Sequence, residues 1–458
     1  MSETPLDNPL KDFASVLRYL LRWVPIAVLT GMMAGTASAL LIWSLNLATR
    51  IREAHIWLIA LLPVAGLLVS CLYQYLGADL ERGNNLIIDE VHDPHQTVPL
   101  RLTPLILFGT FMTHVFGGSA GREGTAVQTG ASLADQLGRP FRMSAVERRI
   151  LLMCGISAGF ASVFGTPLAG AVFGLEVLAI GAVSYEALVP CIVAAFTGDL
   201  VTRDWGIVHG SIDILFIPNV DAKGLLVSAL AGAIFGLVAM AFARSAHAIA
   251  DLCRKYITWI PMRPFAGGIV VALGVWAIHS TKYIGLGDKG IEAAFTGPQP
   301  AVDWIGKFLF TVVTLGSGFK GGEVTPLFFI GATLGNALGN ILPLPTPLLA
   351  GLGFVGVFAG AANTPIASTL MAMELFGAEA GAFAGVACIF SYLFSGNSGI
   401  YQSQKVELRK GGRISADADG SLPLRAKVVE PTEDAEPAED TVPTADAEHA
   451  SELHRSQP

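Results

Sequence analysis

Apolar runs dominate the chain between residues 24 and 394, and no run of comparable length follows them. Runs at 24–47, 56–76 and 224–243 are long enough to cross a bilayer, which takes about 20 residues in a helix. Others, such as 348–362, are shorter or are interrupted by Gly and Pro. Interrupted helices persist in a membrane only where their freed backbone groups are buried in protein or line a cavity. The pattern predicts an all-α polytopic membrane protein with several broken helices.

Basic residues flank the apolar region on both sides. They are Lys11, Arg18 and Arg22 before it, and Lys405, Arg409, Lys410 and Arg413 after it. Because basic residues stay on the cytoplasmic side, we expect both termini there and an even number of crossings. The first eleven residues are polar and the first apolar run lacks a small-residue cleavage site, so we do not expect a cleavable export signal.

Composition supports a membrane protein: 52% of residues are hydrophobic and 14% are charged, against roughly 25% charged in soluble domains. Residues 430–458 hold nine acidic residues and one Arg, a net charge of −8 that equals the −8 of the whole chain. Such a segment buries too little apolar surface to fold. We expect a disordered tail whose acidity says nothing about the charge of a substrate.

Three parts are therefore predicted. Residues 1–23 form a cytoplasmic N-terminal segment, and residues 24–405 form the transmembrane domain, with repeats at 24–205 and 224–405. Residues 406–458 form a cytoplasmic, largely disordered acidic tail.

Two polar, glycine-rich segments repeat each other along this hydrophobic chain. Gly121-Arg122-Glu123-Gly124-Thr125 recurs 200 positions later as Gly321-Gly322-Glu323-Val324-Thr325. Each copy precedes a second matched block: 166–169 (Thr-Pro-Leu-Ala) runs on to Glu176, and 364–367 (Thr-Pro-Ile-Ala) runs on to Glu374, at identical spacing. Such repeated interruptions are the usual sign of a transporter binding site between two structural repeats.

Glu123 is the strongest candidate for a functional residue, because an ionisable side chain inside a membrane is costly. It follows Gly117, Gly118 and Gly121 and precedes the helix-like stretch 126–137. Converging backbone N–H groups and a helix N-terminus make an anion site there. A glutamate in that place can compete with the anion until an anion or a proton displaces it. The simpler alternative is a capping carboxylate.

Two further loops carry similar chemistry. Gly321–Pro326 again opens an apolar helix, and Lys320 ahead of it adds positive potential. Gly83–Ile87 holds Asn84 and Asn85, whose amides could donate to a bare anion or could only cap a helix.

Other chemistry is less well supported. Gly117, Ser119 and Gly121 match the nucleophile-elbow pattern of hydrolases, but the neighbouring segments are membrane-like helices, so we treat the match as chance. His114 is interpreted as a packing residue. The five cysteines show no CxxC spacing and are interpreted as buried hydrophobes. We expect no cofactor, no metal, no nucleic-acid partner and no enzymatic activity.

On these motifs the chain resembles the CLC chloride channels and transporters over about residues 20–405. Glu123 within Gly-Arg-Glu-Gly matches the gating glutamate of that family, and Tyr401 falls at its central tyrosine. The other matches are Gly321–Pro326 on its second anion-binding loop, Gly83–Ile87 on its first, and Thr166–Gly170 on its Ala-Pro-Leu-Ala-Gly stretch.

Several residues depart from the common family pattern. Asn84 replaces a serine, Thr125 a proline, 323–325 (Glu-Val-Thr) an apolar triplet, and Val177 the internal proton-transfer glutamate of chloride/proton antiporters. Glu176 beside it is interpreted as structural. Together these departures resemble the bacterial fluoride-exporting branch.

That resemblance implies a homodimer with one pore per subunit, an inverted repeat, a bacterial inner (plasma) membrane location, and fluoride export coupled to proton entry that confers fluoride resistance. Glu123 would be the gating and proton-coupling residue. The anion-binding residues would be Asn84, Gly121, Arg122, Gly124, Glu323, Val324, Thr325 and Tyr401.

The local chemistry is compatible with fluoride, because stripping water from a small, strongly accepting anion requires many donors. Within the family, the alternative is a chloride/proton antiporter or a chloride channel. Outside it, a sodium-coupled carrier of organic solutes also has inverted repeats, but would not explain Gly-Arg-Glu-Gly together with Tyr401. An intramembrane enzyme lacks a nucleophile and base.

Overall fold

The computed structural model describes residues 9–410 except 211, 213, 408 and 409, and within these residues the chain is almost entirely helical. α1 already begins at Pro9 and runs to Ala54, so much of the predicted N-terminal segment is the start of this long helix. The predicted tail from residue 411 on lies outside the described residues.

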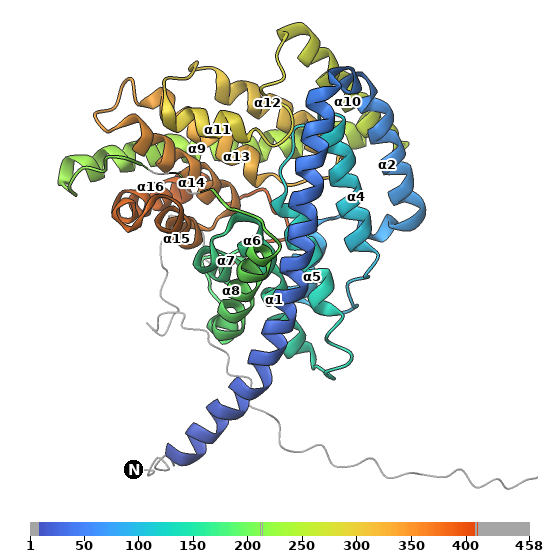
Figure 1. Cartoon of the computed structure of the whole chain (residues 1–458), viewed down its shortest axis with the longest axis vertical. Helices are drawn as coiled ribbons and strands as arrows, with labels where there is room; N and C mark the ends of the chain where they lie inside the picture. The colour runs from blue at the N-terminus through green and yellow to red at the C-terminus, as the bar shows by residue number, and fades with distance from the viewer. Residues whose placement is uncertain (1–8, 211, 213, 408–409, 411–458) are drawn as a thin grey trace, which may run out of the picture. The chain divides into compact units, whose positions relative to one another are not determined.

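Within the described residues the α-helices divide into two successive sets of eight, with short 3-10 helices (η) between some of them, and Figure 1 shows the first set in blue to green and the second in yellow-green to red. After α1 the first set comprises η1 (Ile56–Leu61), α2 (Leu62–Leu76), η2 (Ala78–Leu80), α3 (Asn84–His92), α4 (Leu102–Val115), α5 (Glu123–Asp135), α6 (Ala145–Phe164), α7 (Pro167–Glu176), η3 (Tyr185–Ala187) and α8 (Leu188–Asp204). The second comprises α9 (Ala222–Tyr256), α10 (Met262–Ile278), α11 (Asp288–Thr296), α12 (Asp303–Gly316), α13 (Val324–Leu338), α14 (Thr346–Ala362), α15 (Pro365–Phe376), η4 (Ala378–Ala380) and α16 (Gly381–Phe394).

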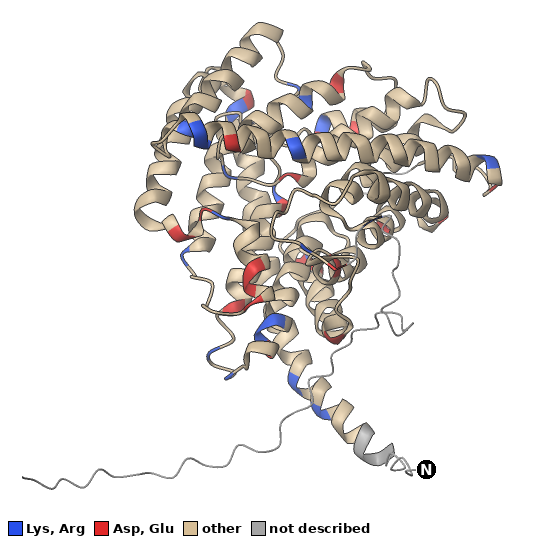
Figure 2. Cartoon of the chain, turned by 180° about the vertical axis from the view of Figure 1, so that it is seen from behind, with Lys and Arg blue, Asp and Glu red and all other residues tan. Residues whose placement is uncertain are grey.

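In the part of the chain that the structure describes, four segments are long and apolar enough to cross a membrane, at 13–54, 56–76, 185–204 and 222–256. Seven further apolar helices in the same part have only 10–17 residues, which matches the predicted mixture of spanning and broken helices. Long stretches of the helical surface carry no charged residue (Figure 2), as a lipid-facing surface requires.

The same helix pairs touch in both halves. α1 contacts α8, α6 and α4, and α9 contacts α16, α14 and α12. α5 contacts α6 just as α13 contacts α14. Each contact in the first half therefore recurs eight helices later, and the predicted repeat is a structural one.

Glycines bring the helices of the innermost pairs into close contact. A Cβ added at Gly155 would lie 2.6 Å from the carbonyl oxygen of Gly130, across the α5–α6 interface. The α13–α14 interface is at least as tight, since Gly331 and Gly353 each face the backbone of the other. Small residues permit such approach, which is how membrane helices commonly pack.

The repeated Thr-Pro blocks form a pair of reciprocal helix caps. Glu176, the last residue of α7, accepts hydrogen bonds from the amides of Ile366 (3.0 Å) and Ala367 (2.8 Å) at the start of α15. Glu374 in α15 accepts from the amides of Leu168 (2.8 Å) and Ala169 (2.9 Å) at the start of α7. This exchange is what a twofold relation between the halves produces, and it supports the structural interpretation of Glu176.

Replacing Glu176 by Gln is expected to destabilise the protein by about 1–3 kcal/mol, because it leaves a buried amide without its acceptor. Glu176 is 5% exposed, whereas Glu374 is only partly buried. Glu374→Gln is therefore expected to destabilise the protein less than Glu176→Gln. Thermal unfolding of both variants in detergent tests this. An unchanged midpoint for Glu176→Gln would contradict it.

Candidate anion site between the repeats

Glu123 is the first residue of α5 and is 1% exposed. Its Oε1 accepts hydrogen bonds from the backbone amide of Thr325 (2.8 Å), from the Thr325 hydroxyl and from the backbone amide of Arg122 (3.1 Å). Its Oε2 has no hydrogen-bond partner within the described part of the chain. Because Thr325 lies in the first turn of α13, the carboxylate of one repeat occupies donors of the other.

Two equivalent glycines join the loops beside this carboxylate. The amide of Gly121 donates to the carbonyl of Gly322 (2.6 Å) and the amide of Gly322 donates back (2.9 Å), as an isolated antiparallel bridge. A Cβ on Gly121 would lie 2.5 Å from both oxygens of Glu123, and one on Gly322 would lie 2.7 Å from the amide nitrogen of Gly124. Only glycine permits this approach at both positions.

Asn84 approaches the same site from the start of α3. The N-cap of α3 is Gly83 and no side-chain hydrogen bond caps this helix, so the structure does not show the simple Asn84 cap that the sequence left open. Nδ2 of Asn84 lies 3.0 Å from where a Cβ on Gly124 would be, and its Oδ1 has no hydrogen-bond partner among residues that the structure describes. The amide therefore remains available beside Glu123.

Asn84 and Tyr401 line one small cavity of about 10 Å³. The other lining residues are Ile87, Ile88, Val127, Ile156, Phe173 and Val177. This volume is near the lower limit for a single water molecule, about 10–15 Å³. Two residues that are 317 positions apart in the sequence thus meet at a space about as large as one water molecule.

The remaining predicted site residues lie around this centre. The Arg122 side chain and Thr325 line a larger cavity of about 1070 Å³, and Nε of Arg122 has no hydrogen-bond partner in the described residues. Glu323 precedes α13 without capping it, and Val324 is 1% exposed. Nζ of Lys320 lies 4.2 Å from the ring centroid of Tyr73 on α2, so the ammonium contacts that helix.

The sequence did not indicate Gln128 or Gln404. Gln128 on α5 is buried, faces Gly83, and its Oε1 has no partner in the portion described. Gln404 donates from Nε2 to the carbonyls of Val177 and Ala362, both at 2.8 Å, and accepts from Asn363 (2.9 Å). Gln404 thereby fastens the segment that carries Tyr401 to helix ends of both repeats.

Asn85 and a short parallel pair complete this attachment. Oδ1 of Asn85 accepts from the amide of Ser403 (3.0 Å). β1 (Ala179–Ile180) pairs with β2 (Lys405–Val406). Gln404 lies outside any recognised motif, so the sequence gives no signal that it holds the segment of Tyr401 in place.

Among the described residues, no group of three or more His, Cys, Asp or Glu could hold a metal ion. Cys154, Cys191 and Cys388 are buried free thiols, while Cys71 and Cys253 are only partly buried.

Comparison with known proteins agrees with this arrangement. Residues 65–396 match the family model for the voltage gated chloride channel. The chain is 54% identical over 397 residues, or 85% of its length, to the chloride/fluoride channel protein of Pseudomonas syringae pv. tomato, covering 88% of that protein.

Solved structures show the same fold. A crystal structure of a CLC-type fluoride/proton antiporter superposes with a TM-score of 0.82 at 35% identity, covering 84% of this chain and 98% of that one. A slow cyanobacterial Cl⁻/H⁺ antiporter superposes with a TM-score of 0.73 at 20% identity, covering 83% of this chain and 96% of that one.

The chain belongs to the CLC family of voltage-gated chloride channels and transporters. It is a polytopic membrane protein whose two repeats meet at the contact between Glu123 and Thr325.

Proposed function

We propose that this protein is a proton-coupled fluoride exporter that confers fluoride resistance on a bacterial cell. It acts in the inner membrane as a homodimer with one pathway per subunit and with both termini in the cytoplasm. Its relative in Pseudomonas syringae is named for chloride and fluoride, and the superposed crystal structure is of a fluoride/proton antiporter. No covalent step is involved, so the protein is not an enzyme.

The contact between Glu123 and Thr325 carries this proposal. An anion that needs the donors of Thr325 must displace the carboxylate that holds them. A proton on Glu123 weakens that hold, because a protonated carboxyl is a poorer acceptor than a charged one. Anion binding and proton binding thus both release the same side chain, which is the requirement for coupling them.

The donors and the space favour fluoride. The hydroxyl of Thr325 and the amide of Asn84 add donors to the backbone groups of both loops. A dehydrated fluoride needs more of them than a larger halide does. The cavity of about 10 Å³ between Asn84 and Tyr401 also suits the smallest halide better than chloride.

Proton coupling explains how such a transporter protects a cell from fluoride. Fluoride is the conjugate base of a weak acid that enters cells as neutral HF and dissociates inside. Export driven by the inward proton gradient lowers the internal concentration again. Val177 offers no carboxyl at the cavity, so Glu123 is the proposed proton carrier.

The ratio of initial fluoride and chloride efflux rates from matched proteoliposomes tests the ion assignment. We expect fluoride to leave far faster than chloride. Equal rates would replace this proposal by the alternative of a chloride/proton antiporter or a chloride channel of the same family.

A further inference from the structure

One face of α12 is polar and fully buried, although it does not contribute to the anion site. Asp303, Lys307, Thr311 and Thr314 follow one another at helical spacing, and none is more than 2% exposed. Buried polar side chains in a membrane protein are costly unless they are hydrogen-bonded. Their partners therefore indicate what this face does.

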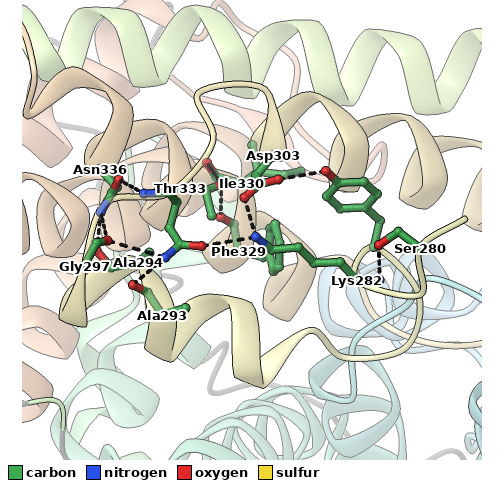
Figure 3. Close-up of polar contacts among 12 residues, drawn as sticks. Ser280, Lys282, Ala293, Ala294, Gly297, Asp303, Phe329, Ile330, Thr333 and Asn336 are labelled. Atoms are coloured by element: carbon green, nitrogen blue, oxygen red, sulfur yellow. Dashed lines mark hydrogen bonds and ion pairs between the residues drawn. The ribbon is translucent and has the colours of Figure 1, made fainter. Parts of the chain in front are cut away.

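The N-terminal end of the face is fixed by an ion pair between a partly exposed lysine and a buried carboxylate. Nζ of Lys282 donates to Oδ2 of Asp303 (2.5 Å), and the hydroxyl of Tyr283 donates to Oδ1 (2.7 Å). Figure 3 shows Lys282 and Asp303 directed toward each other, beside the hydrogen bonds of Asn336 on α13. This end of α12 is thus a rigid anchor.

The middle of the face reaches the 116–122 loop, which joins α4 to Glu123. Nζ of Lys307 donates to the carbonyls of Gly285 (2.7 Å) and Tyr283 (3.3 Å). The amide of Gly285 in turn donates to the carbonyl of Gly118 (2.9 Å). No ion pair joins Lys307 to any described residue, and its ammonium is held by these two carbonyls and by the ring of Phe329, whose centroid lies 5.6 Å from Nζ.

The C-terminal end of the face binds the 116–122 loop directly. The hydroxyls of Thr311 and Ser119 are 2.9 Å apart, and the amide of Ser119 donates to the Thr314 hydroxyl (3.1 Å). Ser119 is therefore fully engaged from the other repeat, 192 positions away. The hydroxyl that resembled a hydrolase nucleophile is a structural contact of this loop.

His114 supports the same loop from α4. Its Nε2 lies 3.1 Å from the carbonyl oxygen of Ala120 and its Nδ1 lies 2.8 Å from that of Thr110, while Arg52 of α1 donates to the carbonyl of His114 (2.8 Å). A neutral imidazole donates from only one of these two nitrogens. Gly118, Ser119 and Gly121 each have a hydrogen bond to a neighbouring element or its adjoining loop.

We propose that the polar face of α12 holds the 116–122 loop in the conformation that presents Glu123 to Thr325, with Lys307, Thr311 and Thr314 as positioning residues. The inference rests on the proposed function. A loop held firmly lets the carboxylate leave Thr325 only in exchange for an anion or a proton. A looser loop lets it drift away without either, so fluoride passes without a proton.

Thr311→Val is the sharpest test, since it keeps the shape of the side chain and removes one hydroxyl. We expect the number of protons moved per fluoride to fall by a factor of about 2–10, the range that corresponds to the net contribution of one neutral hydrogen bond. The ratio is measured on full-length protein in liposomes, from fluoride efflux and fluoride-driven proton uptake recorded together. A merely structural role would lower the yield of folded protein and leave this ratio unchanged.

Two matched variants serve as controls. Thr333→Val on α13 removes a buried hydroxyl that bonds only to its own helix, at the carbonyls of Phe329 and Ile330, and should keep the wild-type ratio. Thr311→Ser restores the hydroxyl and should rescue coupling. Ser119→Ala removes the same bond from the other side, so it should reproduce the loss, and combining it with Thr311→Val should add little.

A wild-type ratio in folded Thr311→Val would overturn the inference, as would an equal loss in Thr333→Val. Should Thr311→Val fail to fold, an unchanged ratio in Ser119→Ala overturns it equally. If the wild-type protein itself moves no protons with fluoride, the proposed function is wrong. If both the wild-type protein and Thr311→Val move protons with fluoride at the same ratio, only the positioning role is refuted and the proposed function stands.

Discussion

Glu123→Gln is expected to abolish fluoride-driven proton movement. Glutamine keeps the shape of the side chain and can still accept hydrogen bonds from Thr325, but it cannot take up and release a proton. Fluoride movement is expected either to stop, because the amide stays on the donors of Thr325, or to continue without protons. Proton uptake by proteoliposomes under an imposed fluoride gradient, followed with a pH electrode, measures the effect.

The control for this variant is Glu379→Gln, which changes an exposed carboxylate in η4 and should leave coupled transport intact. Undiminished coupled proton movement in Glu123→Gln would remove Glu123 from the mechanism. The contact with Thr325 would then be only a helix cap.

Thr325→Val is expected to narrow the preference for fluoride over chloride by roughly ten- to a hundredfold. The removed hydroxyl donates to the charged group that occupies the site. A hydrogen bond to a charged group contributes about 1.5–3 kcal/mol, and about 1.4 kcal/mol corresponds to a factor of ten. Chloride loses less, since a larger anion needs less compensation for its lost water.

Asn84→Leu tests the second donor and is expected to shift the preference in the same direction, because the amide that faces Gly124 is lost. Thr333→Val again provides the matched control, two turns further along α13. The quantity to compare is the fluoride-to-chloride ratio of initial efflux rates. A ratio that stays at the wild-type value in both Thr325→Val and Asn84→Leu would show that backbone amides alone select the ion.

Much of the fold and the centre of the site could be predicted, because the information lies in local patterns that occur twice. Glu123 stood out as a carboxylate in a glycine-rich break of an apolar segment, and the structure places it on donors of the matching break. Asn84 and Val177, which both depart from the common family pattern, also lie close together, since both line the cavity of Tyr401.

Other features could not be predicted, because they depend on partners far away in the chain. Glu176 was interpreted only as structural, and nothing near it indicates that its partners are amides 190 and 191 positions further on. Ser119 matched the pattern of a hydrolase nucleophile in the sequence. Its structural role could not be predicted, because its partner Thr311 lies in an apolar run whose polar face is visible only once the helices pack. Gln404 belongs to no motif, and its role follows from three contacts with helix ends.

The most direct test of the account is whether a fluoride gradient alone drives protons uphill through the wild-type protein. Proteoliposomes loaded with fluoride, at equal pH inside and outside and with the membrane potential held at zero, are diluted into fluoride-free buffer. A fluoride/proton antiporter must acidify the liposome interior as fluoride leaves, and a chloride gradient of the same size must do so far more weakly. Fluoride efflux without any proton uptake would contradict the account.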